Sequence, residues 1–520
     1  MTHSICHGDR SLGSAYAGEE SRASRILMSA LYAASGMLST ERMAAVDANA
    51  AALGIPRKQL MESSGNAVAR EVRAVAEPGE SIALVCGRGN NGGDALVAAR
   101  FLSAYDVTVH LLGRPESITT RIARENWEAL VDAAIPAETV IDATTLDIEG
   151  SEVVVDAVLG TGVAGALREP ERTAVNRIND AHETGSTVVA VDVPSGIDAD
   201  TGTPTGGEDT LAVVADHVVT FHDTKPGLEA LSATVRVTDI GIPEAAERFT
   251  GPGDLLGLGR NTDSHKGENG EVLVVGGGPY TGAPTLSARA ALRAGADLVR
   301  VACPASIARD VQGFSENLIV RGFPGETLAP AHLDRIRELA AGHDTVVFGP
   351  GLGDADATRS FVREFLSGFA GRVVVDADAL RVVPDVETAA ELVCTPHQGE
   401  LVEMGGETAA DPDERAELVG EFAAELGHTL LVKGAVDVIA NPDGDVRLNR
   451  TGNPGMTVGG TGDVLAGTVG ALAARTDPLE AAAAAAYLNG LAGDAAAETN
   501  GNGLVATDLI DRLPQVLYDE

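Results

Sequence analysis

The chain has 520 residues, with 38 lysines and arginines against 76 aspartates and glutamates and a formal net charge of −38. Two large domains are expected at this length, because a single hydrophobic core stops growing at about 250–300 residues. The acidic balance argues against nucleic acids and anionic membranes as partners. No apolar run approaches the roughly 20 residues that a membrane span needs. We therefore expect a soluble cytoplasmic protein.

The charge has two explanations, repulsion of anionic partners or adaptation to high salt, in which screening relieves the repulsion between surface carboxylates. We favour the second, because the carboxylates are dispersed through both halves of the sequence. Lysine is also nearly absent from the sequence. If selection has removed lysine from the surface, the lysines that remain are expected to have a function. The four are Lys58, Lys225, Lys266 and Lys433.

Four cysteines lie far apart with no CxxC spacing, namely Cys6, Cys86, Cys303 and Cys394. This spacing argues against a zinc site or a disulfide framework and fits a reducing compartment. The first 36 residues show no clear periodicity and no apolar stretch of a signal peptide, so we predict a disordered extension. Met37 begins an amphipathic helical pattern.

Strand and helix patterns alternate from Ser81 to about Pro243 and again from Glu271 nearly to the end. The turn-rich, aperiodic stretch 249–263 between them is typical of a linker. We predict two α/β domains, each with three layers (α/β/α), over 37–245 and 261–520, joined by a linker at 246–260.

The first glycine-rich segment, GRGNNGGD at 87–94, follows the buried strand pattern SIALVC and precedes the helical pattern ALVAARFLSAY. Its glycines fit G-x-G-x-x-G between a strand and a helix, so backbone N–H groups and the helix dipole could hold a phosphate. A tight turn is the alternative. The next strand, 107–112, ends in Gly113 and Arg114 rather than in an acid that would bind a ribose hydroxyl, which argues against a standard hydride-transfer domain.

Two further strand patterns end in polar residues. Asp156 lies near the end of the strand at 152–158, and Asp192 and Ser195 follow the strand at 187–193. Ligands of open parallel sheets bind at such carboxyl ends. Asn91, Asp156 and Ser195 together offer hard oxygen ligands for an alkali or alkaline-earth ion. Each alone is equally consistent with a helix cap or a turn.

The segments CGRGNNGGDALVAARFL, DAVLGTGVAGALREP, VAVDVPSGIDADTG and TFHDTKPGL resemble, in order and spacing, the NAD(P)HX epimerase domain, over about 37–245. The resemblance implies a Rossmann-like domain in which Asn91, Asp156 and Ser195 bind potassium. It also implies that Asp192 is catalytic and contacts the nicotinamide end of the hydrated dinucleotide. The implied substrate-binding loops are Asn90, Asn91, Gly92, Gly93 and Asp94, and Gly160, Thr161, Gly162, Val163, Ala164, Gly165 and Ala166. Ala95 stands where the family commonly has glycine, a small change at the start of a helix.

The second half presents glycine, histidine, lysine or acid after five successive strand patterns. The strands at 271–275, 345–348, 372–375, 392–394 and 429–432 lead into GGGPYTGAP, GPGLG, DADAL, TPHQGE and KGAVD. A glycine-dense segment, GNPGMTVGGTGDVLAG, then opens a helix that we expect to begin at Val464. The chain has no G-x-x-x-x-G-K-[ST] motif, which excludes a P-loop enzyme.

Asp463 carries the sharpest signal of this half. The backbone N–H groups of residues 460–462 at a helix N-terminus favour a terminal phosphate, which a neighbouring carboxylate would repel. A general base that takes a proton from an attacking hydroxyl would explain the carboxylate, and a helix N-cap is the alternative. His397 either contacts a substrate or is a buried, hydrogen-bonded histidine.

The segments HKGENGEVLVVGGGPYTGAP, GPGLG, VVVDADAL, TPHQGE, LVKGA and NPGMTVGGTGDVLAG resemble the ADP-dependent NAD(P)HX dehydratase of the ribokinase-like superfamily, over about 260–520. The resemblance implies that the hydrate is bound by Ala283, Gly351, Gly353, His397 and the catalytic Asp463. The implied nucleotide-binding residues are Lys433, Gly434, Ala435, Val436, Asp437 and Gly462. Asp437 stands where the family usually has threonine, and a carboxylate near a nucleotide is unfavourable unless it faces solvent or a cation. Gln398 replaces a usual proline.

The two resemblances together imply a cytoplasmic metabolite-repair enzyme that acts on NADHX and NADPHX, with K⁺ in the first domain and ADP and Mg²⁺ in the second. We also expect a homo-oligomer. A vitamin or sugar kinase is the rival enzyme, but such a kinase has no use for the fused epimerase-like domain. A scaffold, as in decapping-enhancer proteins, is the rival non-enzyme, and it has no need of NNGGD, Asp156 or Asp192.

Overall fold

The computed structural model describes residues 38–162, 165–207, 210–260 and 262–518. They form two compact units, which divide at residues 242 and 243, and the short segment 45–54 belongs to the second unit. The predicted extension at 1–36 lies outside the described residues. The first described helix, α2 (Thr40–Ala52), begins three residues after Met37. Ser39 explains this start, since its hydroxyl accepts the N–H of Arg42 at 3.2 Å and caps the helix.

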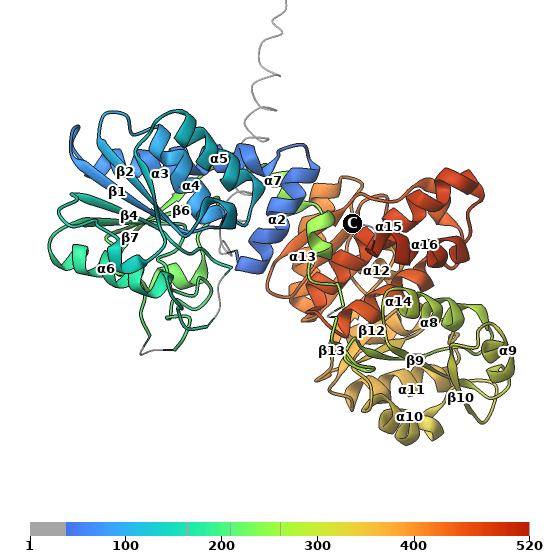
Figure 1. The fold of residues 1–520 in the computed structure, drawn as a ribbon. Helices are drawn as coiled ribbons and strands as arrows, with labels where there is room; N and C mark the ends of the chain where they lie inside the picture. Colours follow the sequence, from blue (N-terminus) through green and yellow to red (C-terminus); the bar gives the residue numbers. More distant parts are fainter. Residues whose placement is uncertain (1–37, 163–164, 208–209, 261, 519–520) are drawn as a thin grey trace, which may run out of the picture. The chain divides into compact units, whose positions relative to one another are not determined.

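The first unit contains a seven-stranded sheet in the order β3-β2-β1-β4-β5-β6-β7 (Figure 1). Every neighbouring pair is parallel. The central strands are short apolar runs that are buried on both faces, as expected for a parallel sheet covered by helices. The strands are β1 (Ser81–Cys86), β2 (Asp106–Leu112), β3 (Ala137–Val140), β4 (Val153–Ala157), β5 (Thr187–Val191), β6 (His217–Phe221) and β7 (Thr234–Thr238).

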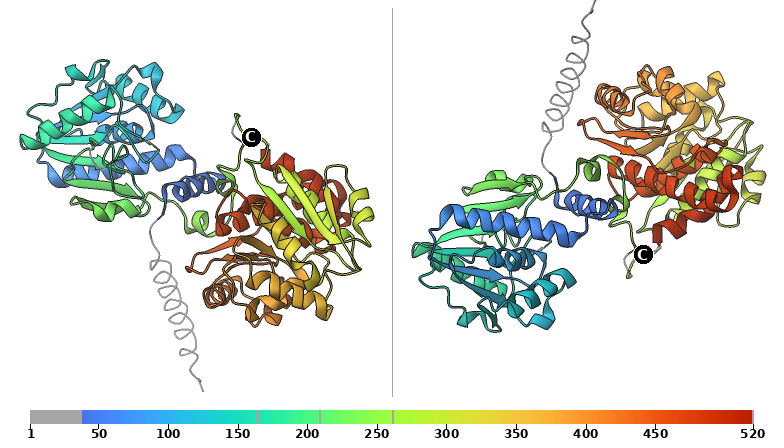
Figure 2. Two further views of the ribbon diagram at one scale, coloured as in Figure 1. Left: turned by 90° about the horizontal axis from the view of Figure 1, so that it is seen from below. Right: turned by 90° about the horizontal axis from the view of Figure 1, so that it is seen from above.

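Helices cover both faces of this sheet (Figures 1 and 2). One face carries α3 (Arg57–Val75), α4 (Asn90–Arg100) and α5 (Arg121–Asp132). The other carries α6 (Glu171–Glu183), whose Val175 and Ile178 pack on the side chains of β1, β4 and β5 that point to this side. The sheet is therefore the middle of three layers.

The second unit contains a nine-stranded sheet in the order β10-β9-β8-β11-β12-β13-β14-β15-β16. Its first seven strands are parallel, and the hairpin β15–β16 extends the edge in antiparallel fashion. The strands are β8 (Glu271–Val275), β9 (Leu298–Pro304), β10 (Ile319–Phe323), β11 (Thr345–Phe348), β12 (Arg372–Val375), β13 (Glu391–Cys394), β14 (Thr429–Val432), β15 (Asp437–Ala440) and β16 (Val446–Asn449).

Alternate residues of these strands enter two cores, one on each face. Val272 and Val274 face α8 (Gly282–Arg293), α14 (Thr461–Ala473) and α15 (Pro478–Asn500), against which α16 (Ala506–Tyr518) packs. Leu273 and Val275 face the opposite core. Its helices are α10 (Leu333–Ala340), α11 (Asp356–Ser367), α12 (Gln398–Glu403) and α13 (Pro412–Leu426), and the short α9 (Ala308–Gly313) follows β9. Both predicted α/β/α architectures are thus confirmed.

The segment expected to act as a linker has defined structure within the second unit. It contains the end of α7 (Glu244–Arg248), and the N–H of Thr250 donates to the Leu448 carbonyl at 2.8 Å. Asp254 is buried and accepts a hydrogen bond from the Asn49 side chain at 3.1 Å. The division between the two units falls at residue 242, and residues 243–260 group with the second.

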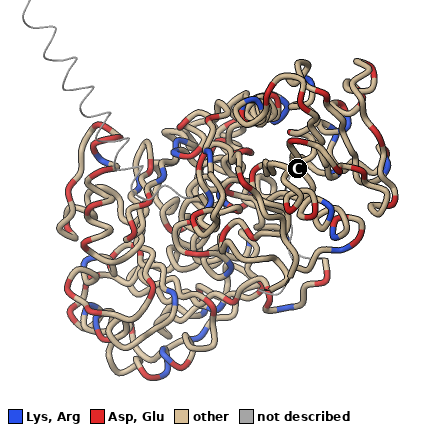
Figure 3. The backbone as a smooth tube through the Cα atoms, turned by 90° about the vertical axis from the view of Figure 1, so that its left-hand side faces the viewer, with Lys and Arg blue, Asp and Glu red and all other residues tan. Residues whose placement is uncertain are grey.

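Acidic positions are spread along the chain rather than gathered in one segment (Figure 3). Three described cysteines, Cys86, Cys303 and Cys394, are buried free thiols. Within the described ranges, no helix combines the length and the apolar composition needed to cross a lipid bilayer.

Candidate functional site

The glycine-rich loop of the first unit lies where its sheet changes direction. The chain continues from β1 to β2 on one side, and β4 pairs with β1 on the other, so the loops after β1 and β4 diverge around a crevice. The two loops touch at its base, since a Cβ on Gly87 would lie 1.9 Å from the carbonyl oxygen of Val158. Gly87 therefore allows the loops to approach closely.

Residues Asn90 to Asp94 form the first turns of α4, which begins five residues earlier than the pattern ALVAARFLSAY suggests. Gly89 is the N-cap residue. The first N–H groups of a helix have no partner within the helix, so they present an anion site to the crevice. Asn90 is exposed, whereas Gly92, Gly93 and Asp94 are buried against neighbouring elements.

Asp156, Ser195 and Asn91 converge on the loop after β4, as expected for the proposed cation ligands. Asp156 is fully buried, and its two carboxylate oxygens accept the Ser195 hydroxyl at 2.6 Å and the Ser195 N–H at 2.7 Å. The carbonyl of Leu159 accepts the Asn91 side-chain amide at 2.8 Å and the Ser195 hydroxyl at 3.3 Å. Burial raises the pKa of Asp156 to about 6.

This donor set would suit an alkali or alkaline-earth cation. Carboxylate, hydroxyl, amide and carbonyl oxygens are hard ligands, and no basic side chain among the described residues pairs with Asp156. A bound cation would supply the positive charge that this buried carboxylate lacks.

The remaining residues of the second predicted substrate loop divide into two groups. A Cβ on Gly160 would lie 3.3 Å from the Cβ of Asn91, so this residue packs against Asn91. Gly165 and Ala166 instead lie against Thr205 and Gly206, and the Gly165 carbonyl accepts the Thr205 hydroxyl at 2.9 Å. Thr161 is half-buried and Gly162 exposed, while Val163 and Ala164 lie outside the described residues.

Asp192 follows β5 with a left-handed backbone, φ 63°, which is uncommon outside glycine and common at functional sites. Its Oδ1 accepts the Thr220 hydroxyl at 3.0 Å and the Lys225 ammonium at 2.6 Å. The Lys225 side chain is 2% exposed and that of Asp192 is 18% exposed. The carboxylate is thus partly open to solvent while its partner stays inside the fold.

The second unit repeats the arrangement where β8 and β11 lie side by side. A Cβ on Gly351 would lie 3.2 Å from the Cβ of Ala283 and 3.1 Å from the carbonyl oxygen of Tyr280, so two predicted substrate residues are adjacent. The N–H of Gly353 donates to Asp378 at 2.9 Å. The Ser287 hydroxyl donates to the carbonyls of Ala283 at 3.3 Å and Asp463 at 2.8 Å, which ties the starts of α8 and α14 together.

Asp463 lies in a cluster of charged groups at the start of α14. The Lys433 ammonium is 3.0 Å from Asp376 and 3.8 Å from Glu400, and a Cβ on Gly462 would lie 3.4 Å from it. Burial and the nearby negative charge of Asp376 raise the pKa of Asp463 to about 7, against a smaller opposing effect of Lys433. The arrangement therefore provides a carboxylate that exchanges a proton near neutral pH.

The N-cap alternative for Asp463 is wrong. Helix α14 begins at Thr461, three residues before the expected start at Val464, and its N-cap is Gly460 with φ 98°. Asp463 thus lies within the first turn, and no side chain caps the helix. The predicted start was too late because glycine has low helix propensity. Gly462 nevertheless lies in the first turn of the helix, where the backbone N–H groups make no intrahelical hydrogen bonds and glycine is tolerated.

His397 is exposed rather than buried, so the alternative of a buried, hydrogen-bonded histidine is wrong, and the residue lies beside Glu400 of the charged cluster. Its side chain is 60% exposed, and its Nδ1 accepts the N–H of Glu400 at 3.0 Å. Glu400 returns the contact by accepting the N–H of His397 at 2.7 Å, which makes a capping box at the start of α12. The other ring nitrogen, Nε2, lies 3.7 Å from the Glu400 carboxylate, and the ring is otherwise open to solvent.

Asp437, where threonine was expected, is engaged inside the fold. Its carboxylate accepts the N–H of Gly434 at 2.9 Å and the side-chain amide of Asn449 at 2.9 Å. Burial raises the pKa of Asp437 to about 6. Asp437 therefore closes the turn that contains Ala435 and Val436, which are exposed and half-buried, respectively.

Comparisons with known proteins cover both units. The family model described as YjeF-related protein N-terminus matches residues 57–227, and the model described as NAD(P)H-hydrate dehydratase matches 272–515. The bifunctional NAD(P)H-hydrate repair enzyme of Methanothermobacter thermautotrophicus is 44% identical over 497 residues, which cover 91% of this chain and 94% of that protein. The enzyme of the same name from Pyrobaculum aerophilum is 45% identical over 495 residues, 91% of this chain and 97% of that protein.

The chain belongs to the family of bifunctional NAD(P)H-hydrate repair enzymes. Among solved structures, an ADP/ATP-dependent NAD(P)H-hydrate dehydratase from Bacillus subtilis, co-crystallized with ATP and Mg²⁺, is 28% identical. The match covers 50% of this chain and 92% of the dehydratase chain, with a TM-score of 0.43. A ribokinase-like superfamily protein from Enterococcus faecalis is 26% identical, covering 52% and 95%, with a TM-score of 0.46.

Three charged residues of this repair-enzyme chain were absent from the predicted site set. Lys225 contacts Asp192, and Asp376 and Glu400 surround Lys433. The sequence held a signal for each, because lysine is scarce, Asp376 directly follows a buried strand, and Glu400 ends the segment TPHQGE. The pairing itself depends on strands far apart in the sequence and has no local signal.

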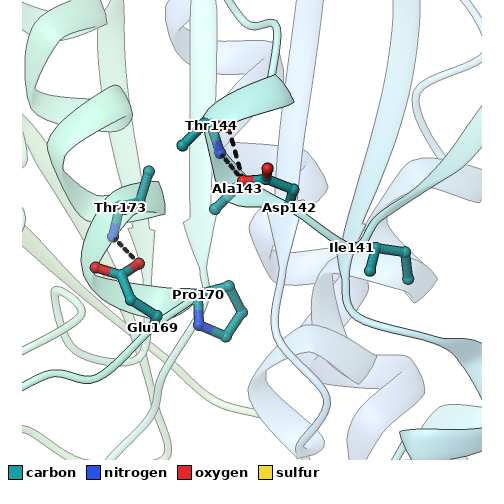
Figure 4. Close-up of a pocket in the computed structure, with 7 residues that line it drawn as sticks. All are labelled: Ile141, Asp142, Ala143, Thr144, Glu169, Pro170 and Thr173. Atoms are coloured by element: carbon teal, nitrogen blue, oxygen red, sulfur yellow. Dashed lines mark hydrogen bonds between the residues drawn. The ribbon is translucent and has the colours of Figure 1, made fainter.

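A surface pocket of about 560 Å³ lies in the first unit of this family member, away from these residues (Figure 4). Its carboxylates serve local structure, since Asp142 accepts the N–H and hydroxyl of Thr144 and Glu169 accepts the N–H of Thr173. None of the predicted site residues lines it; the lining is Ile141, Asp142, Ala143, Thr144, Glu169, Pro170 and Thr173. The pocket is therefore not the candidate active site.

Proposed function

We propose that this chain repairs hydrated NADH and NADPH in two steps, one in each unit. The first unit interconverts the R and S epimers of the hydrate, and the second dehydrates the S epimer with ADP. The observation that carries the proposal is the 44% identity to a bifunctional repair enzyme over 91% of this chain. The clustering of candidate residues at those two edges supports it.

Epimerisation requires that a bond at the hydroxyl-bearing ring carbon break and form again on the other face. We propose that Asp192 takes the hydroxyl proton while the bond from that carbon to the ring nitrogen breaks. The hydroxyl oxygen then forms a carbonyl, and the nitrogen keeps the bonding electron pair. Rotation and reclosure, with return of the proton, give the other epimer. The start of α4, with Asn91, Gly92 and Gly93, would hold a phosphate of the dinucleotide.

Potassium is part of the proposal for the first unit. Asp156, Ser195 and Asn91, with the Leu159 carbonyl, would hold the ion. When bound, the cation would balance the buried carboxylate and fix the loop after β4 beside the substrate.

Dehydration would begin with transfer of the β-phosphoryl group of ADP to the ring hydroxyl. Asp463 takes the hydroxyl proton, the oxygen forms a bond to phosphorus, and AMP leaves with the electrons of the broken P–O bond. Loss of a proton from the neighbouring carbon and of phosphate then restores the ring double bond. Lys433 and the first N–H groups of α14 would position the phosphates and balance their charge.

Magnesium would accompany the nucleotide. No group of three or more histidines, cysteines or carboxylates in the described part of the chain forms a ready metal cage. This fits an ion that keeps several waters and binds mainly through phosphates. Asp376 and Glu400 lie 3.0 Å and 3.8 Å from Lys433. They are the acidic side chains that we propose to contact the magnesium ion or its waters.

A cytoplasmic location, a homo-oligomeric state and adaptation to high salt also remain proposals. The buried free thiols support a reducing compartment. The net charge of −38 supports the adaptation to salt.

The test is to mix the purified chain with an R,S mixture of hydrated NADH and to follow NADH at its absorption band and both epimers by chromatography. The proposal expects epimer exchange without nucleotide and complete conversion to NADH only with ADP and Mg²⁺. A kinase would consume nucleotide on a vitamin or sugar and ignore the hydrate, and a scaffold would leave the R epimer untouched. Either result would contradict the proposal.

A further inference from the structure

Lys225 is a buried lysine whose hydrogen bonds all stay inside the protein. Its ammonium donates to Asp192 Oδ1 at 2.6 Å, to the Thr220 hydroxyl at 2.6 Å and to the Phe221 carbonyl at 3.2 Å. An ammonium has three hydrogens, so this set uses all of them. With a side chain that is 2% exposed, Lys225 cannot reach a substrate as a ligand or a nucleophile.

Two of these three contacts, those to Asp192 and Thr220, converge on one oxygen of the Asp192 carboxylate. Thr220, on β6, receives a hydrogen bond from Lys225 and donates its own to Asp192 Oδ1 at 3.0 Å. Among the described residues, none donates to Oδ2 of Asp192. The backbone of Asp192 is held in place as well, because its N–H donates to the Val219 carbonyl at 2.8 Å in a left-handed conformation.

We infer that Lys225 is a positioning residue for epimerisation, which fixes Asp192 by Oδ1 so that Oδ2 alone faces the hydrated nicotinamide ring. Thr220 is the second member of this device. The inference rests on the proposed epimerase function of the first unit and adds how its carboxylate is oriented.

A contribution to the stability of the fold does not explain why a lysine is buried at position 225. A buried ion pair is costly to desolvate, and hydrophobic side chains of similar volume are often as stable or more stable in its place. The chain also carries only four lysines. The buried Lys225 beside Asp192, whose backbone is left-handed, is explained by the need to hold the geometry of the Asp192 carboxylate. Small misplacements of a reacting group cost large factors in rate.

The test uses the full chain with Lys225→Met, which keeps the length of the side chain and removes the ammonium. We expect kcat for epimerisation of the R hydrate to fall about 100-fold while KM changes less than about threefold. ADP-dependent dehydration of the S hydrate, in the second unit, should be unchanged and reports that the chain is intact. Lys58→Met is the matched control, because Lys58 forms a surface ion pair with Glu125 in the same unit and its side chain is 54% exposed. It should change neither activity.

Two further variants cover a loss of folding. Thr220→Val is close to isosteric and removes a hydrogen bond to Oδ1 without changing charge, so we expect kcat to fall by about tenfold. The double variant Asp192→Asn with Lys225→Met removes both charges, so its melting temperature should recover relative to Lys225→Met, while epimerisation should stay lost.

The inference is overturned if Lys225→Met or Thr220→Val folds and epimerises within twofold of the parent. It is also overturned if the loss lies wholly in KM or if the double variant regains epimerisation with its stability. Absence of epimerisation in the parent chain, with dehydration intact, would instead contradict the proposed function of the first unit.

Discussion

The two sheet edges place a scarce lysine beside a carboxylate in different ways. In the first unit Lys225 lies 2.6 Å from Asp192, the residue proposed to act on the substrate. In the second, Lys433 lies 3.0 Å from Asp376. The proposed base Asp463 forms no ion pair with Lys433 among the described contacts, but the charges of both Lys433 and Asp376 act on its pKa. The first arrangement fixes the orientation of a carboxylate. The second leaves a buried carboxylate with a pKa of about 7.

The difference matches the chemistry proposed for each unit. A base that must accept a hydroxyl proton during phosphoryl transfer is most effective when its pKa lies near the working pH. Asp376 contributes to that value by its negative charge, and Lys433 limits the rise. Orientation by an ion pair and adjustment of a pKa by a neighbouring charge are thus separate uses of the same residue types.

Asp463→Asn should produce the largest effect. The amide keeps the size of the side chain but cannot accept the proton, so we expect dehydration to fall by roughly 100-fold or more while epimerisation is unchanged. Burying an ionised carboxylate is unfavourable, and the pKa of Asp463 is raised from 3.8 to about 7. The cost to the folded state therefore grows as pH rises from about 4 to about 7 and is fully present above 7. The variant should therefore melt at a temperature equal to or higher than the parent at pH 8.

The pH profile gives the matching control. In the parent, the rate of dehydration should fall as pH drops through about 7, where Asp463 becomes protonated. The residual activity of Asp463→Asn should lack this step. Dehydration within threefold of the parent would remove Asp463 from the chemistry.

Lys433→Met should have the next largest effect. Lys433 lowers the pKa of Asp463, so its removal raises that pKa and leaves less of the base ionised at pH 7. We expect a loss of about tenfold in dehydration at pH 7, part of which returns at higher pH. Lys266→Met, at an exposed lysine of the same unit, is the control. An unshifted pH profile would restrict Lys433 to nucleotide binding.

Much of this architecture follows from the sequence, because parallel strands are short apolar runs with glycine or acid at their ends. The strands at 81–86, 271–275, 345–348, 372–375 and 429–432 agree with the predicted bounds. Helix starts were less accurate. Both α4 and α14 begin inside their glycine-rich segments, since the first turn of a helix tolerates glycine.

The partners of charged residues were not predictable in the same way. Asp192 and Lys225 lie 33 residues apart, and Asp376 and Lys433 lie 57 apart. Their pairing is set by the order of the strands rather than by local spacing. The sequence could indicate that these residues are unusual, but only the sheet topology brings them together.

Asp156→Asn tests the cation site that is proposed for the first unit alone. We expect epimerisation by the parent to rise several-fold with K⁺, and the variant to lose this response because the amide carries no charge for the ion to balance. Burial raises the pKa of Asp156 to about 6, so K⁺ stimulation in the parent should weaken as pH drops through 6 and protons compete for the site. Titration of epimerisation and dehydration with KCl on one preparation would measure both. Equal stimulation of the variant would exclude this site.

Truncation compares how self-contained the two units are. A fragment that starts at residue 260 lacks Thr250 and Asp254, which contact Asn449 and Arg447 of the hairpin β15–β16. Each buried polar group left without its partner should cost about 1–3 kcal/mol. We expect a fragment from residue 243 to unfold at higher urea concentration than one from 260, although both should dehydrate. Equal midpoints would mean that 243–260 is only a linker.

Salt should have the smallest effect and should separate general screening from a specific ion. The net charge of −38 repels itself, and the Debye length falls from about 30 Å at 0.01 M salt to about 3 Å at 1 M. Because acidic residues are spread through both halves, both activities and the melting temperature should rise, by about twofold in rate, over this range. NaCl and KCl should act alike on dehydration, whereas KCl should exceed NaCl on epimerisation if Asp156 holds potassium. Full activity and stability at the lowest salt would contradict adaptation to high salt, and identical effects of the two salts on epimerisation would contradict the potassium site.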